Sequence, residues 1–421
     1  MIKIINCNKK NYLSILTKFL DIRRSENKTE NKTVFKILKD IKKNKYKGLL
    51  KYEKKYSKNS QIKLSSKQIN LVVKSLDPKT RKAIDFAYKR ILKFHTTQKA
   101  KDIFYKDNLN NKIEYKYVPI QSVGIYVPAN LPSTLLMNAI PAKIAGVKRI
   151  VLANPKNNGK LNPAVLYAAK KLGIKEIYSM GGAQAIGSLA YIQRVNKIVG
   201  PGNIFVAAAK RQVFGDVGIE GMIAGPSEIT VVADNKTDLN EVTTSMIGQA
   251  EHDSHSQCIL ITKDSNLIKK FKKDLKMRLK DIPRKNIATK SIENNGLILK
   301  VYNDNQIIDS INEIAPEHLE INVGNYKKYK DKIFNAGSIC IGRYSPMALT
   351  DYAVGTNHVL PTNSSAKFSS GLSLSEFYKK ISLITLSKKG VEKIGEYATH
   401  LAEYEELKGH ALSIKSRINK E

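Results

Sequence analysis

Four of the seven histidines in this 421-residue chain lie beside acidic or amide residues, in patterns suited to metal binding and proton transfer. They are His252, His318, His358 and His410. Imidazole exchanges protons near neutral pH and is a common ligand of zinc. Because all four lie in the second half of the chain, we expect them to belong to one metal-dependent active site.

Two of these clusters permit both a functional and a structural interpretation. Gln249 and His252 are three residues apart on an expected helix, so both could bind one cation from the same face. Alternatively, His252 only contacts the last carbonyls of that helix. Glu317 and His318 stand between an expected helix and an expected strand, where the pair suits proton transfer or forms a surface turn. Asp351 is either a hard oxygen ligand or a helix N-cap.

Three glycine-rich turns are candidates for binding phosphate: Gly181-Gly182, Gly200–Asn203 and Gly225–Glu228. In open α/β sheets, ligands bind at the carboxyl ends of the strands, where backbone N–H groups can face phosphates. The chain has no G-x-G-x-x-G string, so this motif does not predict a dinucleotide site.

From about Tyr117, short β-rich runs alternate with helical segments, which predicts βαβ units and parallel sheets. The chain before about residue 115 and after about residue 373 is expected to be helical. Asp238 is expected to cap a helix, with Glu241 completing a capping box. The expected strands span 123–127, 149–152, 176–179, 197–199, 229–233, 258–262, 297–301, 319–323 and 338–341, and the expected helices include 33–41, 66–76, 78–97, 133–145, 163–172 and 183–190.

The formal net charge of +35 is compatible with two kinds of surface. A strongly basic chain can bind nucleic acid or an anionic membrane. However, the lysines are scattered along the whole sequence, and clusters such as Lys42–Lys47 lack the repeated aromatic residues of a nucleic-acid platform. We therefore expect a solvated basic surface, with no nucleic-acid or membrane partner.

Cysteine usage and hydropathy indicate the compartment. Cys7, Cys258 and Cys340 are widely separated, which fits a reducing cytoplasm and argues against a disulfide framework. No apolar run approaches the ~18 residues that span a bilayer, and the N-terminus lacks the pattern of a signal peptide. We expect a cytoplasmic protein.

In their order along the chain, the strings around these residues resemble the histidinol dehydrogenase family. The resemblance extends from about Tyr117 to Ile414 and is weaker in the N-terminal quarter. The most specific strings are GIYVP (124–128), PAKIAG (141–146), GGAQA (181–185), KIVGPGN (197–203), AGPSE (224–228), QAEHD (249–253), APEHL (315–319), NHVLPT (357–362) and FSSGL (368–372).

The resemblance implies oxidation of L-histidinol to L-histidine through the aldehyde, the last step of histidine biosynthesis. It also implies two NAD per reaction and one zinc ion per subunit. Matched position by position, the zinc ligands would be Gln249, His252, Asp351 and His410. The substrate would fill the remaining coordination positions, so the zinc would mainly orient it.

The same match assigns catalytic and binding roles. His318 resembles the general base that takes the hydroxyl proton, and Glu317 resembles the residue that activates water to hydrate the aldehyde. Tyr126, Gln184 and Asn203 match positions that contact NAD. The substrate contacts would be Ser227, Gln249, His252, His318, Asp351, Glu405 and His410.

The implied fold class is α/β, with two incomplete Rossmann-like parallel-sheet globules and helical N- and C-terminal extensions. Its parts would be an extension at 1–22, a first α/β domain of 23–122 and 232–371 that carries the metal and catalytic residues, a second α/β domain of 123–231 on the NAD side, and a helical tail at 372–421. The tail would lie in the interface of a homodimer with shared active sites, where His410 completes the zinc site of the other subunit. On one continuous tail helix, Glu406 rather than Glu405 would share the face of His410.

A few positions depart from the family pattern. The loop after Pro128 is shorter, Met347 stands where the family usually has Glu, and Thr350 replaces a Gly. None of these changes removes a predicted ligand or base. Two alternatives stay open: a single-step zinc and NAD dehydrogenase of another amino alcohol, or a basic nucleic-acid-binding protein.

Overall fold

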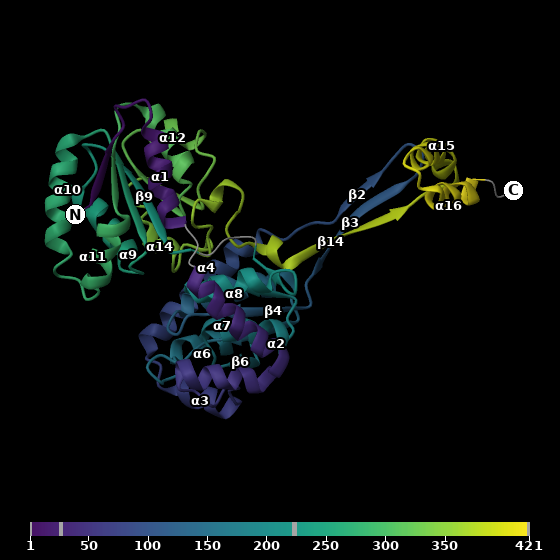
Figure 1. Cartoon of the computed structure of the whole chain (residues 1–421), viewed down its shortest axis with the longest axis horizontal. Coiled ribbons are helices and arrows are strands. Elements are labelled where there is room, and N and C mark those ends of the chain that lie inside the picture. The colour runs from purple at the N-terminus through teal and green to yellow at the C-terminus, as the bar shows by residue number, and fades with distance from the viewer. Residues whose placement is uncertain (1, 25–27, 221–224, 419–421) are drawn as a thin grey trace. The chain divides into compact units, whose positions relative to one another are not determined.

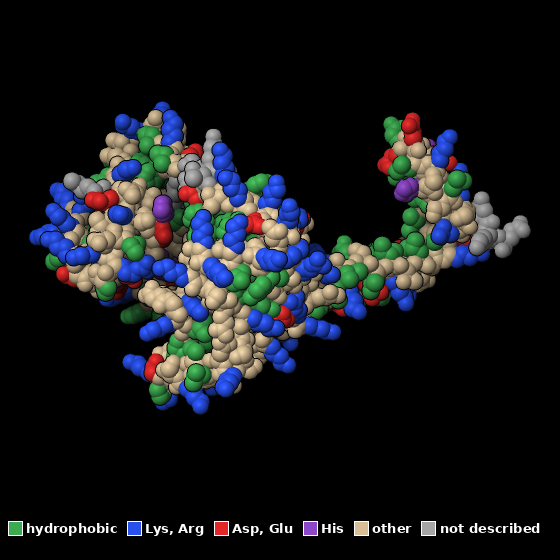
Figure 2. Space-filling view, turned by 60° about the horizontal axis from the view of Figure 1, so that its bottom comes forward, with side chains coloured by type: hydrophobic (Ala, Val, Ile, Leu, Met, Phe, Trp, Pro, Cys, Tyr) green, Lys and Arg blue, Asp and Glu red, His purple; other side chains and the backbone are tan. Residues whose placement is uncertain are grey.

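The computed structural model describes residues 2–24, 28–220 and 225–418. Within these ranges the chain forms two compact units, and Figure 1 labels many of their elements. The first unit contains the chain up to Gln98 and the stretch Gln121–Glu376, and the second contains Lys99–Ile120 and the chain from Phe377 onward. Lysine and arginine side chains are spread over the face shown in Figure 2 rather than gathered in one patch. No helix of the described residues is long and apolar enough to cross a membrane.

A six-stranded parallel sheet, of order β1-β11-β10-β9-β12-β13, forms one half of the first unit. All residues of β9 and β10 are buried, as expected for strands covered by helices on both faces. The strands are β1 (Lys3–Asn6), β9 (Glu228–Ala233), β10 (Gln257–Thr262), β11 (Leu297–Lys300), β12 (His318–Asn322) and β13 (Ser338–Ile341). The helices are α1 (Tyr12–Arg24), α9 (Leu239–Ala250), α10 (Ser265–Arg278), α11 (Lys285–Asn295), α12 (Asp304–Ile314), α13 (Lys327–Lys330) and α14 (Met347–Thr350), followed by the 3-10 turns η1 (Ser365–Lys367) and η2 (Leu374–Phe377).

The alternation of side chains along β9 divides the core of this sheet into two layers. Ile229 and Val231 belong to the layer that contains residues of α9, α10 and α11. Val232 belongs to the other layer, which contains residues of α1 and α12. These two helices pack together and lie side by side in Figure 1.

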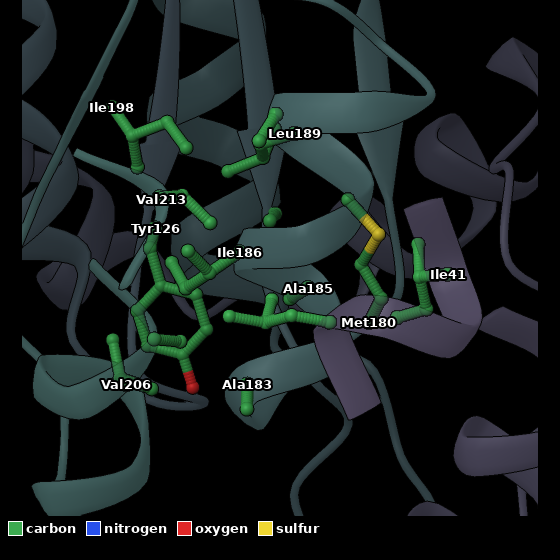
Figure 3. Close-up of a cluster of buried hydrophobic side chains, with 14 of the residues drawn as sticks. Ile41, Tyr126, Met180, Ala183, Ala185, Ile186, Leu189, Ile198, Val206 and Val213 are labelled. Carbon is green, nitrogen blue, oxygen red and sulfur yellow. The ribbon is translucent and has the colours of Figure 1, made fainter. Parts of the chain in front are cut away.

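A five-stranded parallel sheet, of order β6-β5-β4-β7-β8, forms the other half of the first unit. The long helix α2 packs against α7 and α8, and Figure 3 shows its Ile41 beside Met180 in the shared core. The strands are β4 (Ser122–Tyr126), β5 (Arg149–Ala153), β6 (Glu176–Tyr178), β7 (Lys197–Val199) and β8 (Gly218–Ile219). The helices are α2 (Lys28–Ser57), α3 (Ser66–Lys74), α4 (Pro78–Thr96), α5 (Pro132–Ala145), α6 (Pro163–Lys171), α7 (Gly182–Tyr191) and α8 (Ile204–Val213).

The two sheets share one topology. Counted along the chain within each sheet, β4 to β8 and β9 to β13 both have the order 3-2-1-4-5, and β1 extends the edge of the six-stranded sheet. The order therefore reverses between β4 and β7 in one sheet, and between β9 and β12 in the other. In open α/β sheets, the carboxyl ends of the strands at such a switch point are the usual place for a ligand.

The second unit is a three-stranded antiparallel sheet, of order β14-β3-β2, with a pair of helices. Its elements are β2 (Ile103–Lys106), β3 (Lys112–Pro119), β14 (Tyr378–Thr385), α15 (Lys388–Tyr404) and α16 (Lys408–Ile418), and the two helices pack together. Several of its large apolar side chains face outward. Phe104, Ile384 and Leu401 are 60%, 64% and 60% exposed.

The predicted α/β fold is confirmed, and each predicted strand is present with its ends within one residue of the expected positions. The helical prediction for the two terminal regions is wrong in part, because β1, β2, β3 and β14 lie within them. No residue of β2, β3 or β14 is buried, and these strands lack the apolar run of a buried strand. In β3, the apolar or aromatic residues Ile113, Tyr115 and Tyr117 alternate with charged residues, a pattern that could have predicted this strand.

The first 120 residues are also divided between the two sheets differently from the prediction. β1 pairs with β11 and α1 packs on α12, so this segment is part of the six-stranded half and not an extension. In contrast, α2, α3 and α4 pack on helices of the five-stranded half, although they were grouped with residues 232–371. Of that stretch, Ala353 and Val354 accept hydrogen bonds from Arg90 of α4 through their carbonyl oxygens. An amphipathic helix shows that it covers a core, but its sequence does not identify which of two sheets it covers.

Both ends of α9 differ in detail from the prediction. Asp238 caps the helix as expected, but the Glu241 carboxylate accepts hydrogen bonds from other elements and does not close a capping box. The helix ends at Ala250, so His252 lies in the following turn and does not share a helical face with Gln249.

Candidate active site

The predicted catalytic pair lies at the amino-terminal edge of the six-stranded sheet. α12 ends at Ile314, Ala315 takes a left-handed conformation (φ 48°), and β12 begins at His318. This connection buries both Glu317 and His318 and leaves Glu317 Oε1 3.9 Å from His318 Nε2. Asp351, which directly follows α14, joins the pair with its Oδ1 3.8 Å from His318 Nε2.

Burial sets the charge of the histidines in this site, because a charged imidazole loses its hydration there. It lowers the pKa of His318 to about 3, with a further contribution from the nearby His358 and His252. It also lowers the pKa of His358 to about 4 and holds the pKa of His252 below its usual value. The three imidazoles are therefore neutral near pH 7, which is the form that accepts a proton or binds a metal ion.

Asp351 is a buried carboxylate whose backbone is held by His358. Burial raises the pKa of the Asp351 carboxyl to about 7. The Nδ1 of His358 donates a hydrogen bond to the Asp351 carbonyl oxygen (2.8 Å), so its Nε2 accepts from the Thr134 hydroxyl (3.4 Å). His358, for which the sequence predicted no individual role, therefore holds the Asp351 backbone in place.

The Glu317 carboxylate is oriented by the start of β9. The backbone N–H of Glu228 donates to Glu317 Oε2 at 2.8 Å, and Oε1 is the oxygen 3.9 Å from His318 Nε2. The backbone N–H of Asn363 donates to Glu228 Oε1 at 2.8 Å and holds that side chain in turn. Ser227, the predicted substrate contact, is half-buried at the same edge of the sheet. Glu228 was missed as a site residue, although it ends the string AGPSE, of which Ala224 lies outside the described residues.

The chemistry of the predicted zinc ligands in this unit fits a metal ion. Gln249 is buried, and its Oε1 has no hydrogen-bond partner among the described residues. His252 follows in a turn closed by its N–H on the Gln249 carbonyl oxygen (3.2 Å), and its imidazole is neutral near pH 7. An unpaired amide oxygen, a neutral imidazole and the Asp351 carboxylate are suitable donors for zinc. In residues 2–24, 28–220 and 225–418, no three His, Cys, Asp or Glu side chains form a metal-binding group by themselves.

The remaining predicted ligand and substrate contact belong to the second unit. α15 ends at Tyr404 with Glu405 as its C-cap, and Glu406 has a left-handed conformation (φ 61°), so α15 and α16 are separate helices. The expectation that Glu406 shares a continuous helical face with His410 is therefore wrong. Glu405 and His410 are both exposed.

The predicted NAD contacts lie at the carboxyl edge of the five-stranded sheet. Tyr126 ends β4, Gln184 lies in the first turn of α7, and Asn203 caps α8 by accepting from two backbone N–H groups. Gly200 (φ 108°) brings the turn after β7 against the Tyr126 carbonyl oxygen, so closely that a Cβ would clash there. The contacts thus border the switch point between β4 and β7.

Three buried charged residues at this edge were not predicted. Glu53 of α2 accepts hydrogen bonds from Gly181 N and from Gln184 Nε2, both at 2.9 Å. Lys210 of α8 pairs with Glu220 and donates to the Gly200 carbonyl oxygen. Within a lysine-rich helix, no local signal separates Glu53 from a surface glutamate.

The departures from the family pattern lie beside the site. Met347 is 2% exposed and packs in the core of the six-stranded sheet. Its N–H donates to Glu320 Oε1 at 2.6 Å, and the Thr350 hydroxyl donates to the Met347 carbonyl oxygen at 2.6 Å. The short helix before Asp351 is therefore fixed through its backbone and does not need a glutamate at position 347.

Comparison with known proteins gives one consistent result. A family model described as histidinol dehydrogenase matches residues 21–418. The histidinol dehydrogenase of Pelagibacter ubique (strain HTCC1062) is 56% identical over 427 residues and covers 100% of both chains. That of Acinetobacter baylyi is 44% identical over 365 residues, covering 85% of each chain. The crystal structure of histidinol dehydrogenase from Elizabethkingia anophelis matches with a TM-score of 0.91 at 35% identity, covering 99% of this chain and 98% of that chain.

Proposed function

The chain belongs to the histidinol dehydrogenase family of NAD-dependent oxidoreductases, and we propose that it oxidises L-histidinol to L-histidine through L-histidinaldehyde, with two NAD per reaction. The observation that most supports this proposal is the buried pair Glu317 and His318 beside Asp351. A proton acceptor next to a carboxylate that can activate water provides the acid–base groups needed by two successive oxidations.

In the first oxidation, His318 acts as the general base. Its neutral imidazole takes the hydroxyl proton of histidinol while the hydride on the same carbon leaves for NAD, which yields the aldehyde and NADH. Nε2 is the nitrogen that faces the oxygens of Glu317 and Asp351. These carboxylates stabilise the positive charge that develops on the ring as it accepts the proton.

In the second oxidation, Glu317 acts on water. Its Oε1 accepts a proton from a water molecule that adds to the aldehyde carbon, and the resulting hydrate loses a second hydride to NAD. The backbone N–H of Glu228 holds Oε2, so the orientation of the carboxylate does not depend on the substrate. Ser227 stands beside this contact and would hydrogen-bond the polar groups of the substrate.

We assign the zinc site to Gln249, His252 and Asp351 together with His410. A zinc ion held there would bind the imidazole and the amine of histidinol and so fix the position of its reacting carbon. The unpaired Gln249 Oε1 and the raised pKa of Asp351 support this assignment, because both groups would gain from a bound cation.

The active form is proposed to be a homodimer in which each second unit serves the other subunit. Its helices expose apolar side chains such as Tyr404 and Leu412, which are 83% and 66% exposed. Burial of such surface is a common driving force for association. Glu405 and His410, exposed on the same unit, would then reach the substrate and the zinc of the partner.

The cytoplasm is the proposed compartment. The three cysteines, Cys7, Cys258 and Cys340, are free and buried, which suits a reducing environment.

The stoichiometry of NADH is the direct test of the proposed reaction. Purified protein is incubated with limiting L-histidinol and excess NAD, and NADH and histidine are quantified. Two NADH per histidinol are expected, whereas one NADH with accumulating aldehyde would support a single-step dehydrogenase. A chelator is expected to abolish turnover and added zinc to restore it. Steep salt-dependent binding to DNA or RNA would instead support the nucleic-acid alternative.

A further inference from the structure

Glu53 is a buried carboxylate at the nucleotide edge that the proposed reaction does not use. It lies near the end of α2 and is 1% exposed. Its Oε1 accepts hydrogen bonds from Gly181 N and from Gln184 Nε2, both at 2.9 Å. Burial raises the pKa of Glu53, while the hydrogen bonds from Gly181 and Gln184 oppose that rise. Burying a carboxylate costs free energy unless it is hydrogen-bonded. Its two hydrogen bonds therefore indicate that Glu53 has a specific role at this position.

The contact with Glu53 fixes which end of the Gln184 amide faces outward. An ionised carboxylate can only accept hydrogen bonds, so the NH₂ group of Gln184 must turn toward Glu53. The amide oxygen then turns away, and no group among the described residues donates to it. Gln184 is only 3% exposed, and this oxygen lies near Gly182, where an added Cβ would be 3.0 Å from it. A nearly buried acceptor without a donor is suited to a ligand that brings a donor.

Glu53 also changes what the start of α7 can bind. In many dinucleotide sites, the free N–H groups at a helix N-terminus bind the pyrophosphate. Here Glu53 accepts the Gly181 N–H, and the Tyr126 hydroxyl accepts the Gly182 N–H at 3.3 Å. The first two amides at the start of α7 are therefore already used, and the Gln184 side chain is available to a ligand.

We propose that Glu53 is a positioning residue for the nucleotide. It holds the Gln184 amide so that Oε1 accepts a hydrogen bond from a hydroxyl or amino group of NAD. The proposal rests on the proposed NAD contact at Gln184, and the experiments below separate the failure of that contact from the failure of Glu53.

The first experiment measures the Kd of NAD by calorimetry, without histidinol, so that catalysis does not contribute. Glu53→Met removes the acceptor at similar side-chain length, and the Kd is expected to rise roughly tenfold. Glu53→Gln keeps an amide oxygen where Oε1 was, and the Kd is expected to stay within roughly twofold of wild type. Glu30→Met is the control, because Glu30 lies at the other end of α2, before its kink at Lys45, and it is expected to leave the Kd unchanged. Equal weakening by Glu53→Gln and Glu53→Met would overturn the proposal, because the acceptor oxygen would then not matter.

The second experiment exchanges donor and acceptor and does not depend on the folding of Glu53→Met. Gln184→Glu places two carboxylates against each other and is expected to raise the Kd of NAD by roughly tenfold or more. In the double variant Glu53→Gln/Gln184→Glu, the amide of residue 53 donates to the carboxylate of residue 184, and an acceptor oxygen still faces outward. The Kd is expected to return to within roughly threefold of wild type. Weakened binding that the second change does not restore would overturn the role of Glu53, whereas an unchanged Kd in Gln184→Glu alone would overturn the NAD contact itself.

Discussion

The five-stranded sheet and the six-stranded sheet share the strand order 3-2-1-4-5, but their proposed site residues lie at opposite edges. In the five-stranded sheet, Tyr126 and Asn203 lie at the carboxyl ends of β4 and β7, where open α/β sheets usually bind ligands. In the six-stranded sheet, Glu317 and His318 lie at the amino end of β12, and Ser227 lies before the amino end of β9. The topology alone would therefore point to the edge that holds the proposed nucleotide contacts, and away from the edge that holds the proposed catalytic pair.

The carboxyl edge of the six-stranded sheet is closed by its own side chains. At the switch point, the Thr237 hydroxyl donates to the Asn322 carbonyl oxygen, and Asp234 Oδ2 accepts from Gly324 N at 3.2 Å. Beyond these contacts, Asp304 binds Lys263, Lys328 and Tyr329. Hydrogen bonds and ion pairs thus occupy the place where a ligand would bind.

The proposed site residues at the amino edge come from segments that lead back to this edge. α9 and α12 run back from the carboxyl edge and end with Gln249 and with the turn that carries Glu317. The residues after α14 add Asp351. In a βα unit, the start of the strand and the end of the helix both lie at this edge. The proposed site contains residues from both places.

The largest effect is expected for His318→Asn at the amino edge of the six-stranded sheet. Loss of the general base should lower kcat by about 10²–10⁴-fold and leave the zinc content unchanged, because His318 is not a ligand. His252→Asn should lose zinc first, and added zinc should partly restore its activity. Metal analysis of both purified variants checks the assignment. Loss of zinc from His318→Asn would show that the role assigned to His318 is wrong.

Mixing two inactive variants tests whether the amino edge is completed by a second subunit. If His410 acts in the partner's site, a dimer of His318→Asn with His410→Asn has one site with both defects and one with neither. Random exchange of equal amounts should then restore about one quarter of the wild-type activity, because half the dimers are mixed and half of their sites are intact. Exchange is confirmed with differently tagged subunits. A fully exchanged mixture that stays inactive would exclude the shared site.

The sequence identified the buried parts of this molecule better than the exposed parts. β9 and β10 were predictable because they are continuous apolar runs, and the cap at Asp238 was predictable from local chemistry. In contrast, seven of the eight residues of β14 are exposed, so no buried face distinguishes it as a strand within the tail. The packing of α2 on the five-stranded sheet depends on contacts between distant segments, which a single sequence does not specify.

The candidate site shows the same division. Gln249, His252, Glu317 and His318 were predicted from the family strings QAEHD and APEHL, because each string carries the proposed site residues themselves. Asp351 was predicted from the position-by-position match with the family. Glu53 was missed because its partner Gln184 belongs to a different helix. Lys210 was missed because its partner Glu220 lies beyond the end of α8. Buried charges become recognisable only when the fold shows what surrounds them.

A large change in stability is expected at the carboxyl edge of the five-stranded sheet. Lys210→Met leaves Glu220 buried without its cation and should lower the free energy of unfolding by about 3–5 kcal/mol. The double variant Lys210→Met/Glu220→Leu should regain much of this loss, because both charges are removed. Lys263→Met is the control at the carboxyl edge of the other sheet. It breaks an exposed pair with Asp304 and should cost less than about 1 kcal/mol in urea denaturation. Equal losses in the two single variants would contradict the difference between the edges.

The smallest effect on activity is expected at the closed carboxyl edge of the six-stranded sheet. Thr237→Val keeps the shape of the side chain but removes the hydroxyl that donates to the Asn322 carbonyl oxygen and accepts from Asp234 N at 2.9 Å. The free energy of unfolding should fall by about 1–3 kcal/mol, because two polar groups lose a partner. Because no ligand binds at this edge in the proposed arrangement, kcat and the KM of both substrates should stay within roughly twofold of wild type. Tyr126→Phe at the corresponding edge of the five-stranded sheet is the matched variant, and it should raise the KM of NAD. A loss of activity in Thr237→Val without a loss of stability would show that this edge also serves the reaction.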